Sequence, residues 1–559
     1  MAETLLSPGV LARETDQSFI QGQPVQAGAA IVGPAAKGPV GLPTLVTSFS
    51  EYQAIYGGAV TSGSQQYAYT TATSAQNYFS QGGNSLLVTR VQSGSFTAAT
   101  STTIANENTS ASFALKTLDE GTIANSATGT KENVKWEITG VSKETGTFSL
   151  LVRRGDDIHS NKTVLETFAN LSLDPKSPNY ISKQIGDTSF TVENDGTDYY
   201  VKEDGQYVNK SKYIRVSAVN TPTLDFFDNS GDFKPALTSS LPVAGSGSFS
   251  GATGELFPSG AAKFGKDITA GNIQGINQLD YTESLDLLSN TDNYKFNLIT
   301  VPGLNHNDHA TAVNKAVTLA EGRQDCIAVI DLRGYDATVA QVKSQASSFN
   351  SSYAATYWPW LQTVNAETAQ TVWVPASTMI PGVYALTDRS SDAWFAPAGL
   401  TRGALGNVIK AERKLTAGNR DTLYAANVNP IATFPGNGVV VFGQKTLQKG
   451  ASALDRVNVR RLLIELKSYI SQVSDNLVFE QNSIATRNGF LTQVNPYLES
   501  IQQRQGLYAF KVVMDETNNT ADVVDRNELV GQIFLQPTKT AEFIVLDFNV
   551  LPTGATFPA

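Results

Sequence analysis

The stretch Phe296–Leu332 reads FNLITVPGLNHNDHATAVNKAVTLAEGRQDCIAVIDL, and its pattern decides the fold class. Phe296–Val301 is an apolar run that ends at Pro302-Gly303, which is typical of a buried strand followed by a turn. His309–Glu321 then carries alanine and valine at helical spacing, and Cys326–Leu332 is a second apolar run. A strand, a helix and a strand in this order predict a parallel pair joined by a right-handed crossover.

The same rhythm continues on both sides of this stretch. Val339–Phe349 is predicted to be the next helix. Far upstream, Gly28–Val32 and Leu86–Val91 read as short buried strands, and Tyr67–Phe79 between them reads as a helix. We therefore expect one α/β middle domain made of two separate pieces of the chain.

Residues 96–270 separate these two pieces and have a different character. Serine, threonine, glycine, asparagine and aspartate dominate, and short alternating runs such as Lys135–Thr139 and Thr147–Val152 recur between them. Alternation over a few residues with many turn-forming residues predicts a β-rich insertion with long loops. We interpret it as a surface decoration that carries no chemistry.

The longest helix is predicted in the last third of the chain. From Val459 to Leu477, apolar residues recur in steps of three and four, which makes one broad buried stripe. A second helix is expected over Thr486–Arg504, and Leu507–Met514 after it reads as a strand. These elements predict a C-terminal α+β domain.

Both ends of the chain look like segments that need a partner. Residues 1–20 hold too little apolar surface to fold alone, so we interpret them as an arm. Residues 542–551 alternate apolar and polar positions toward their end, as a half-buried strand does, and such a strand pairs within its own chain or with another subunit. The candidate residues for contacts between subunits are Pro8, Gly9, Val10, Ile544, Leu546, Phe548 and Val550.

The predicted fold class is therefore α/β and multi-domain: an α/β core and a C-terminal α+β domain, with a β-rich insertion and extended N- and C-terminal arms. The expected division is an N-terminal arm at 1–20, a middle domain at 21–95 plus 271–385, an inserted outer part at 96–270, a C-terminal domain at 386–536 and a C-terminal strand arm at 537–559.

Composition and charge argue against several classes of protein. The net charge is −10, and we find no basic stripe, which disfavours nucleic acid or an anionic membrane as a partner. Charged residues make up only 16% of the chain, which weakens repulsion between copies. The single cysteine, Cys326, excludes an internal disulfide and is expected to be buried and inert. The first residues lack a signal peptide pattern, and no apolar run is long enough to span a membrane, so we expect assembly in a cytoplasm.

The residues that could carry chemistry do not form a convincing site. His306 and His309 have a spacing that metal ligands can use, but no third ligand can be assigned. His159 is the other candidate base, and the Gly-Ser stretches lack the strand and helix that a serine nucleophile requires. Gly436–Gly438 lacks the lysine and hydroxyl residue of a phosphate-binding loop. We therefore predict no catalytic, cofactor-binding or metal-binding residues and no enzymatic activity, with an extracellular hydrolase as the alternative.

Several segments occur along the chain in a recognisable order, among them Val32–Pro39, Glu166–Asp174, Tyr357–Trp360, Val374–Ser377, Val459–Leu462, Phe479–Asn482 and Ala541–Val545. Together they span nearly the whole chain. These segments and their order resemble the tail sheath proteins of contractile-tailed bacteriophages.

The resemblance implies a structural protein of the virion tail that is assembled in the host cytoplasm. It implies hexameric rings of this chain, stacked helically around an inner tail tube protein, with residues 386–536 as the inner layer. Baseplate and tail terminator proteins would be further partners, and the arms would add strands to sheets of adjacent subunits. Contraction of such a tube would drive the inner tube through the host envelope for genome delivery. The sheath of a bacteriocin or a secretion system is the related alternative.

Overall fold

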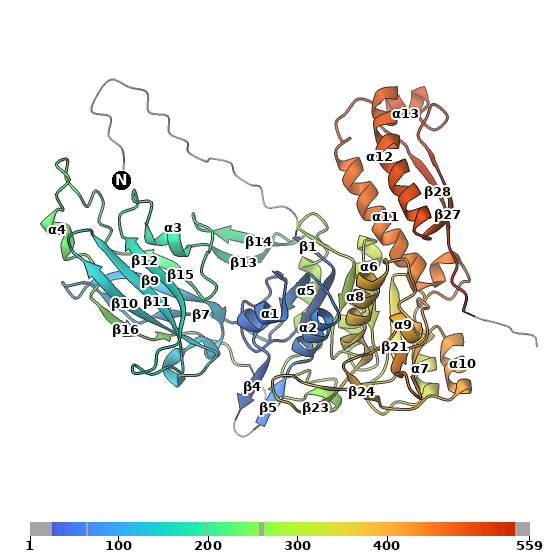
Figure 1. The fold of residues 1–559 in the computed structure, drawn as a ribbon, viewed down its shortest axis with the longest axis horizontal. Coiled ribbons are helices and arrows are strands. Elements are labelled where there is room, and N and C mark those ends of the chain that lie inside the picture. The colour runs from blue at the N-terminus through green and yellow to red at the C-terminus, as the bar shows by residue number, and fades with distance from the viewer. Residues whose placement is uncertain (1–24, 63–64, 197, 257–261, 543–559) are drawn as a thin grey trace, which may run out of the picture.

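The computed structural model describes residues 25–62, 65–196, 198–256 and 262–542. The described chain has an α/β multi-domain fold, with a β-rich part, a central α/β part and a C-terminal helical part in a row (Figure 1). The seven candidate arm residues lie outside the described residues, so the calls on Pro8–Val10 and on the final strand stay predictions.

An eight-stranded sheet forms the centre of the molecule, in the order β26-β25-β21-β20-β19-β2-β6-β3. The strands from β25 to β6 are parallel, and β26 and β3 pair antiparallel at the two edges. The bounds are β2 Ala29–Gly33, β3 Thr44–Val46, β6 Leu86–Arg90, β19 Leu298–Thr300, β20 Ile327–Ile330, β21 Ala354–Trp358, β25 Asn429–Phe434 and β26 Gly438–Val441.

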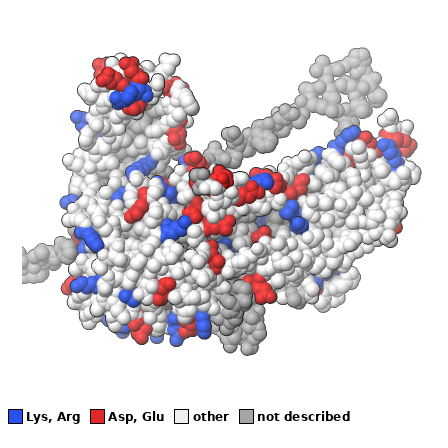
Figure 2. Space-filling view, turned by 180° about the vertical axis from the view of Figure 1, so that it is seen from behind, with Lys and Arg blue, Asp and Glu red and all other residues white. Residues whose placement is uncertain are grey.

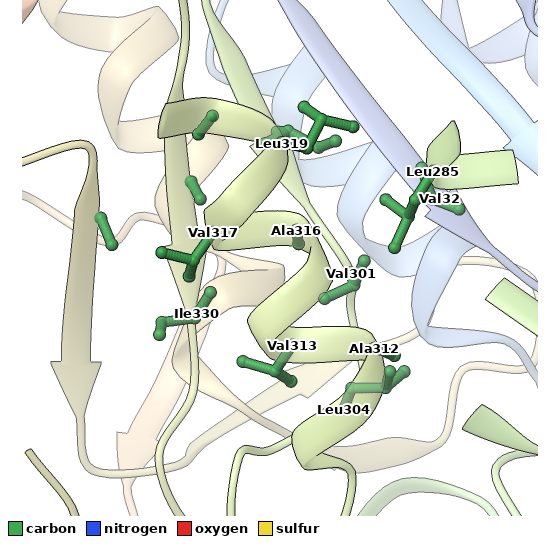
Figure 3. Close-up of a cluster of buried hydrophobic side chains, with 14 of the residues drawn as sticks. Val32, Leu285, Val301, Leu304, Ala312, Val313, Ala316, Val317, Leu319 and Ile330 are labelled. Carbon is green, nitrogen blue, oxygen red and sulfur yellow. The ribbon is translucent and has the colours of Figure 1, made fainter. Parts of the chain in front are cut away.

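Helix α6 (Ala310–Arg323) connects the adjacent parallel strands β19 and β20, which confirms the strand, helix and strand predicted from Phe296–Leu332. Figure 3 shows Ala312, Val313 and Ala316 of this helix beside Val301 and Ile330. The small alanine side chains let the helix approach the sheet closely, and the valine side chains fill the space that remains. Because the sheet is covered on both faces, its strands are apolar throughout rather than alternating.

The opposite face of the sheet is covered by α1 (Phe49–Tyr56), α2 (Thr70–Ser80) and α8 (Ile380–Ser390). Ile431 and Val441 of β25 and β26 belong to this same buried cluster. The central sheet thus includes residues that the sequence analysis assigned to the C-terminal domain at 386–536. Strand order depends on contacts between distant segments, here Tyr357 beside Asn429, and periodicity along the chain does not reveal such contacts.

The insertion contains two antiparallel sheets that share one apolar core. One has the order β12-β11-β10-β16, and the other has β15-β9-β7-β17 with β8 beside β9. The alternating runs named above lie in β10 (Val134–Ser142) and β11 (Thr147–Arg154), so the prediction of a β-rich insertion is confirmed. The other bounds are β7 Ala98–Ser101, β8 Ile104–Ala105, β9 Ala111–Glu120, β12 Val164–Ser172, β15 Ile214–Val219, β16 Gly245–Gly247 and β17 Phe249–Ser250.

The C-terminal unit consists of α11 (Val457–Asp475), α12 (Ile484–Gln503), α13 (Ala521–Asp525) and the hairpin of β27 (Leu507–Val513) and β28 (Gln532–Pro537). Both long helices and the strand predicted from the sequence are present. Helix α11 takes part in two cores. Val457 and Ile464 pack into the central core, whereas Leu462 and Leu466 pack into the core of the C-terminal unit.

Asp331 is a buried carboxyl group that follows β20, and it should make stability depend on pH. It is 4% exposed, and its Oδ1 accepts a hydrogen bond from the backbone N–H of Ser377 at 3.1 Å. Desolvation raises its pKa from 3.8 to about 7, although hydrogen bonds from Ser377 and Ala376 favour the charged form. Between these pH values the folded chain holds a proton that the unfolded chain has released, so stability falls as pH rises.

We predict that Asp331→Asn removes this dependence, which reaches at most about 1.4 kcal/mol per pH unit. The melting temperature of the variant should change less between pH 5 and pH 8 than that of the wild type. Asp292→Asn is the control, because Asp292 is exposed. An unchanged pH slope in Asp331→Asn would contradict the assignment.

Candidate functional site

The usual ligand site of an open parallel sheet is occupied by side chains of this chain. Such sheets bind ligands at the carboxyl ends of the strands, where the strand order reverses, here between β2 and β19. Gln274 and Thr70 lie there, both buried. Gln274 Oε1 accepts from the Thr70 backbone N–H at 2.8 Å, and its Nε2 donates to Thr70 Oγ1 at 2.8 Å. Thr70 Oγ1 in turn donates to the carbonyl oxygen of Pro302 at 3.0 Å, so the crevice is filled.

The histidines considered from the sequence have structural contacts. His309 is fully buried, its Nδ1 accepts from the Asn305 backbone N–H, and its Nε2 lies 3.1 Å from the carbonyl oxygen of Thr269, to which it donates. His306 contacts Gln345 and the ring of Phe349. His159 is exposed in the insertion. Within the described ranges, no group of three or more histidine, cysteine or acidic residues could hold a metal ion.

Two further observations concern chemistry and membranes. Burial raises the pKa of the Cys326 thiol well above its ordinary value, so this cysteine is a buried thiol rather than a reactive one.

Among the helices that the structure describes, none combines the length and apolar character needed to span a membrane.

The described residues next to the C-terminal segment form a charged anchor around Glu542. Arg456 Nε donates to Glu542 Oε1 at 2.7 Å, and Arg456 Nη2 donates to Oε2 at 3.0 Å. Tyr424 Oη donates to Oε2 at 2.9 Å, and Gln444 Nε2 donates to Oε1 at 3.0 Å. Residue 542 is thus held against the central part and against the start of α11.

Burial and hydrogen bonding oppose each other at this carboxylate. Partial burial alone would raise the pKa of Glu542, but hydrogen bonds from Arg456, Gln444 and Tyr424 outweigh it, so the pKa lies below its ordinary value. No local pattern in the sequence indicates this anchor, because Tyr424, Gln444 and Arg456 lie 118, 98 and 86 residues before Glu542. The sequence analysis therefore describes the C-terminal segment without the side chains that hold Glu542.

A second notable feature is the hairpin of β27 and β28, which forms a sheet of only two strands. One face packs on the helices through Phe510, Val512, Ile533 and Leu535, while Tyr508 and Phe534 on the other face are 63% and 57% exposed. Among the described strands, none pairs with the outer edge of β27 or β28. Two-stranded sheets are only marginally stable alone, and open edges are templates for further strands.

At the other end, β1 (Val25–Ala27) pairs in parallel with β18 (Tyr294–Phe296). Tyr294 and Phe296 of β18 belong to the central core, so the first described residues are fixed to the central part. Each end of the described chain is fixed to the same central part, at different places.

Comparisons with known proteins agree on one family. The family model of the phage tail sheath protein central domain matches residues 274–447, and that of the phage tail sheath C-terminal domain matches residues 451–550. The tail sheath protein of Vibrio phage KVP40 is 34% identical over 324 residues, which cover 54% of this chain and 48% of the relative. That of Enterobacteria phage T4 is 31% identical over 327 residues, covering 55% and 48%. The matched part thus spans about half the length of these curated relatives.

A solved structure shows a similar fold. The crystal structure of a sheath tail protein from Listeria innocua superposes with a TM-score of 0.52 at 10% sequence identity, and the match covers 92% of this chain and 95% of that one. At this identity the likeness concerns the fold alone.

The anchor at Glu542 generates a test. Glu542→Gln should weaken the contact with Arg456, since a hydrogen bond to a charged group is worth about 1.5–3 kcal/mol. Hydrogen exchange of the backbone at residues 538–542 should become faster in the variant. In the wild type, lowering the pH below the depressed pKa of Glu542 should reduce the protection of these amides relative to the intrinsic exchange rate at the same pH, because protonation removes the charge.

The matched control is Glu499→Gln, which changes an exposed carboxylate on α12. Exchange at residues 538–542 should stay at the wild-type rate in that variant. Equal rates in the wild type and Glu542→Gln would show that the ion pair does not hold this segment.

Proposed function

The chain belongs to the phage tail sheath family, and from this premise we propose that it is a structural subunit that polymerises into the sheath of a contractile tail. The observation that carries the proposal is the two-stranded sheet of β27 and β28, whose outer edges no described strand covers. A sheath subunit needs such edges, because strands from neighbouring copies complete the sheet.

We propose that the segments before residue 21 and after residue 542 are the strands that neighbours receive. The C-terminal arm was expected to begin at residue 537, but Pro537 lies in β28 and Glu542 is held by its own chain. Each added main-chain hydrogen bond contributes about 0.5–1.5 kcal/mol. Each of the four apolar residues Ile544, Leu546, Phe548 and Val550 adds at most about 1.5–3 kcal/mol when fully buried. After the ordering of the arm is subtracted, each link retains several kcal/mol, and it is repeated in every subunit.

The assembled form that we propose is a stack of six-membered rings, related by a helical twist, around an inner tail tube protein. The C-terminal unit would form the inner layer, and the insertion would form the outer one. Such strand links would let the globular parts rotate and slide while the polymer stays connected. Relaxation to a shorter and wider tube would then drive the inner tube through the host envelope, with baseplate and terminator proteins at the two ends.

The filled crevice supports a structural role over an enzymatic one. Its buried polar groups bond one another, as the contacts among Gln274, Thr70 and Pro302 illustrate. A second candidate function is the sheath of a bacteriocin or secretion system. The large insertion at 96–270 favours a phage tail, since sheaths of those systems often lack one.

Truncation tests the arms directly. We predict that chains lacking residues 1–20 or 541–559 remain soluble and folded but do not form tubes, because the links between copies are lost. Sedimentation and negative-stain microscopy measure assembly, and circular dichroism measures folding. Normal tubes from both truncated chains would exclude the arm mechanism.

A point substitution tests the final strand separately. Ile544→Asp or Phe548→Asp should block assembly and shift the melting temperature of the monomer little, because the apolar face is buried only between copies. Ile544→Val is the control that keeps an apolar side chain. Loss of the folded monomer in either aspartate variant would instead place this strand in the core of its own subunit.

A further inference from the structure

The far end of the C-terminal unit, which we call the tip, displays apolar side chains to solvent. The tip comprises residues 475–484 and 515–528, at the loop between α11 and α12 and around α13. Phe479 is fully exposed, at 103%, and Val478 and Ile484 are 62% and 60% exposed. Single exposed apolar residues are common, but three within seven positions indicate an interaction surface.

The loop that displays Phe479 is held in one conformation by hydrogen bonds. Phe479 has a φ of 70°, a left-handed conformation that is unfavourable for a bulky side chain. Asn482 Nδ2 donates to the carbonyl oxygen of Glu528 at 2.9 Å, and Ser483 caps α12 by accepting from the Thr486 backbone N–H. These bonds hold the loop against the α13 segment, so the phenyl ring points outward from a fixed support.

The tip is also acidic. Figure 2 shows red side chains gathered at this end of the C-terminal unit. Arg526 forms an ion pair with Glu528 at 3.0 Å, which neutralises one carboxylate there. The remaining exposed acids include Asp475, Glu480, Glu516, Asp522 and Asp525. A partner for the tip must therefore offer both apolar surface and positive charge.

The same chain carries a surface of that kind, which we call the basic face. It consists of residues 402–420 and 434–442, where β24 (Val408–Ala411) lies beside β26 and α10 (Ala417–Ala425) packs on β25. Residues 402–420 include five basic side chains and one acidic one. Ile409 and Phe442 on this face are 52% and 45% exposed.

On the basic face, one guanidinium group lies beside two aromatic rings. The Arg420 guanidinium lies 5.4 Å from the centre of the Phe434 ring and 5.8 Å from that of Phe442. The two rings are 5.1 Å apart and roughly perpendicular. A further exposed phenyl group can add to such a cluster through ring and cation–π contacts.

We propose that the tip of one copy docks on the basic face of a second copy, with Phe479 as its apolar anchor. The tip and the basic face are well separated, since α13 lies at the upper right and α10 at the lower right of Figure 1, so they do not meet within one copy. A contact between two different surfaces of identical subunits repeats without end unless it closes into a ring. This inference rests on the proposed function and assigns a second contact between copies, independent of the arms.

Charge reversal provides the test, on the full-length chain. Asp522→Lys with Asp525→Lys reverses the charge of two acids on α13, and Lys410→Glu with Lys414→Glu reverses the charge of two exposed lysines on the face. Each pair should raise the protein concentration needed for assembly by about tenfold or more, as loss of a hot-spot contact does. The chain that carries all four substitutions should recover assembly, because the two reversed groups attract each other again.

The role of Phe479 is tested in the same assay. Phe479→Ala should raise the assembly concentration, whereas the control Phe190→Ala, which removes an exposed phenyl group from the insertion, should not. The melting temperatures of both variants should match that of the wild type, since neither side chain is buried.

Cross-linking locates the contact. The native thiol of Cys326 is buried, so Val478→Cys introduces one accessible thiol for a benzophenone label. Mixing labelled copies with isotopically heavy copies should give links to residues 402–442 of the heavy chain. Links to any other region, or assembly of all charge variants at the wild-type concentration, would overturn the inference and leave the proposed sheath function standing. A wild-type chain that never assembles would contradict both.

Discussion

Helix α11 is the constraint on which the arrangement of this molecule depends. Val457 and Ile464 of this helix are buried in the central core, whereas Leu462, Leu466 and Val473 are buried in the core of the C-terminal unit. Arg456, just before the helix, holds Glu542, and Phe479 lies a few residues after its end. A helix of 19 residues spans about 28 Å, so one rigid rod sets the distance between the anchor of the C-terminal segment and the tip.

Buried charge fixes the angle at which this rod leaves the central part. Arg461 is 6% exposed, its Nη2 donates to both carboxylate oxygens of Asp388 on α8, and its guanidinium lies 4.6 Å from the centre of the Tyr384 ring. Arg460 lies 4.0 Å from the centre of the Tyr353 ring. Such groups add little net stability compared with apolar packing, but a misplaced helix would leave an unpaired buried charge. They therefore favour one orientation of α11, which the proposed contraction would require.

The sequence predicts individual strands and helices well, but it predicts contacts between distant segments poorly. The stretch Phe296–Leu332 specifies its strands and helix because burial on both faces and helical spacing are local patterns. The place of β25 beside β21 and the anchor at Glu542 depend on segments that approach only in the folded chain. Phe479 belongs to a segment that resembles the family, yet its exposure follows from the left-handed turn and could not be read from residue type. The predicted arm residues lie outside the described ranges and stay predictions.

The low content of charged residues affects how copies of this chain would approach one another. With 16% charged residues, repulsion between copies is weak over most of the surface, so small patches of charge determine how copies approach. The acids at the tip and the bases on residues 402–420 are such patches, and they lie well apart in one copy. The proposed strand links would determine which copies are connected, but they would leave the orientation of the globular parts free. The proposed salt-sensitive contact between the tip and the basic face would supply that orientation, and it could break and re-form while the strand links persist.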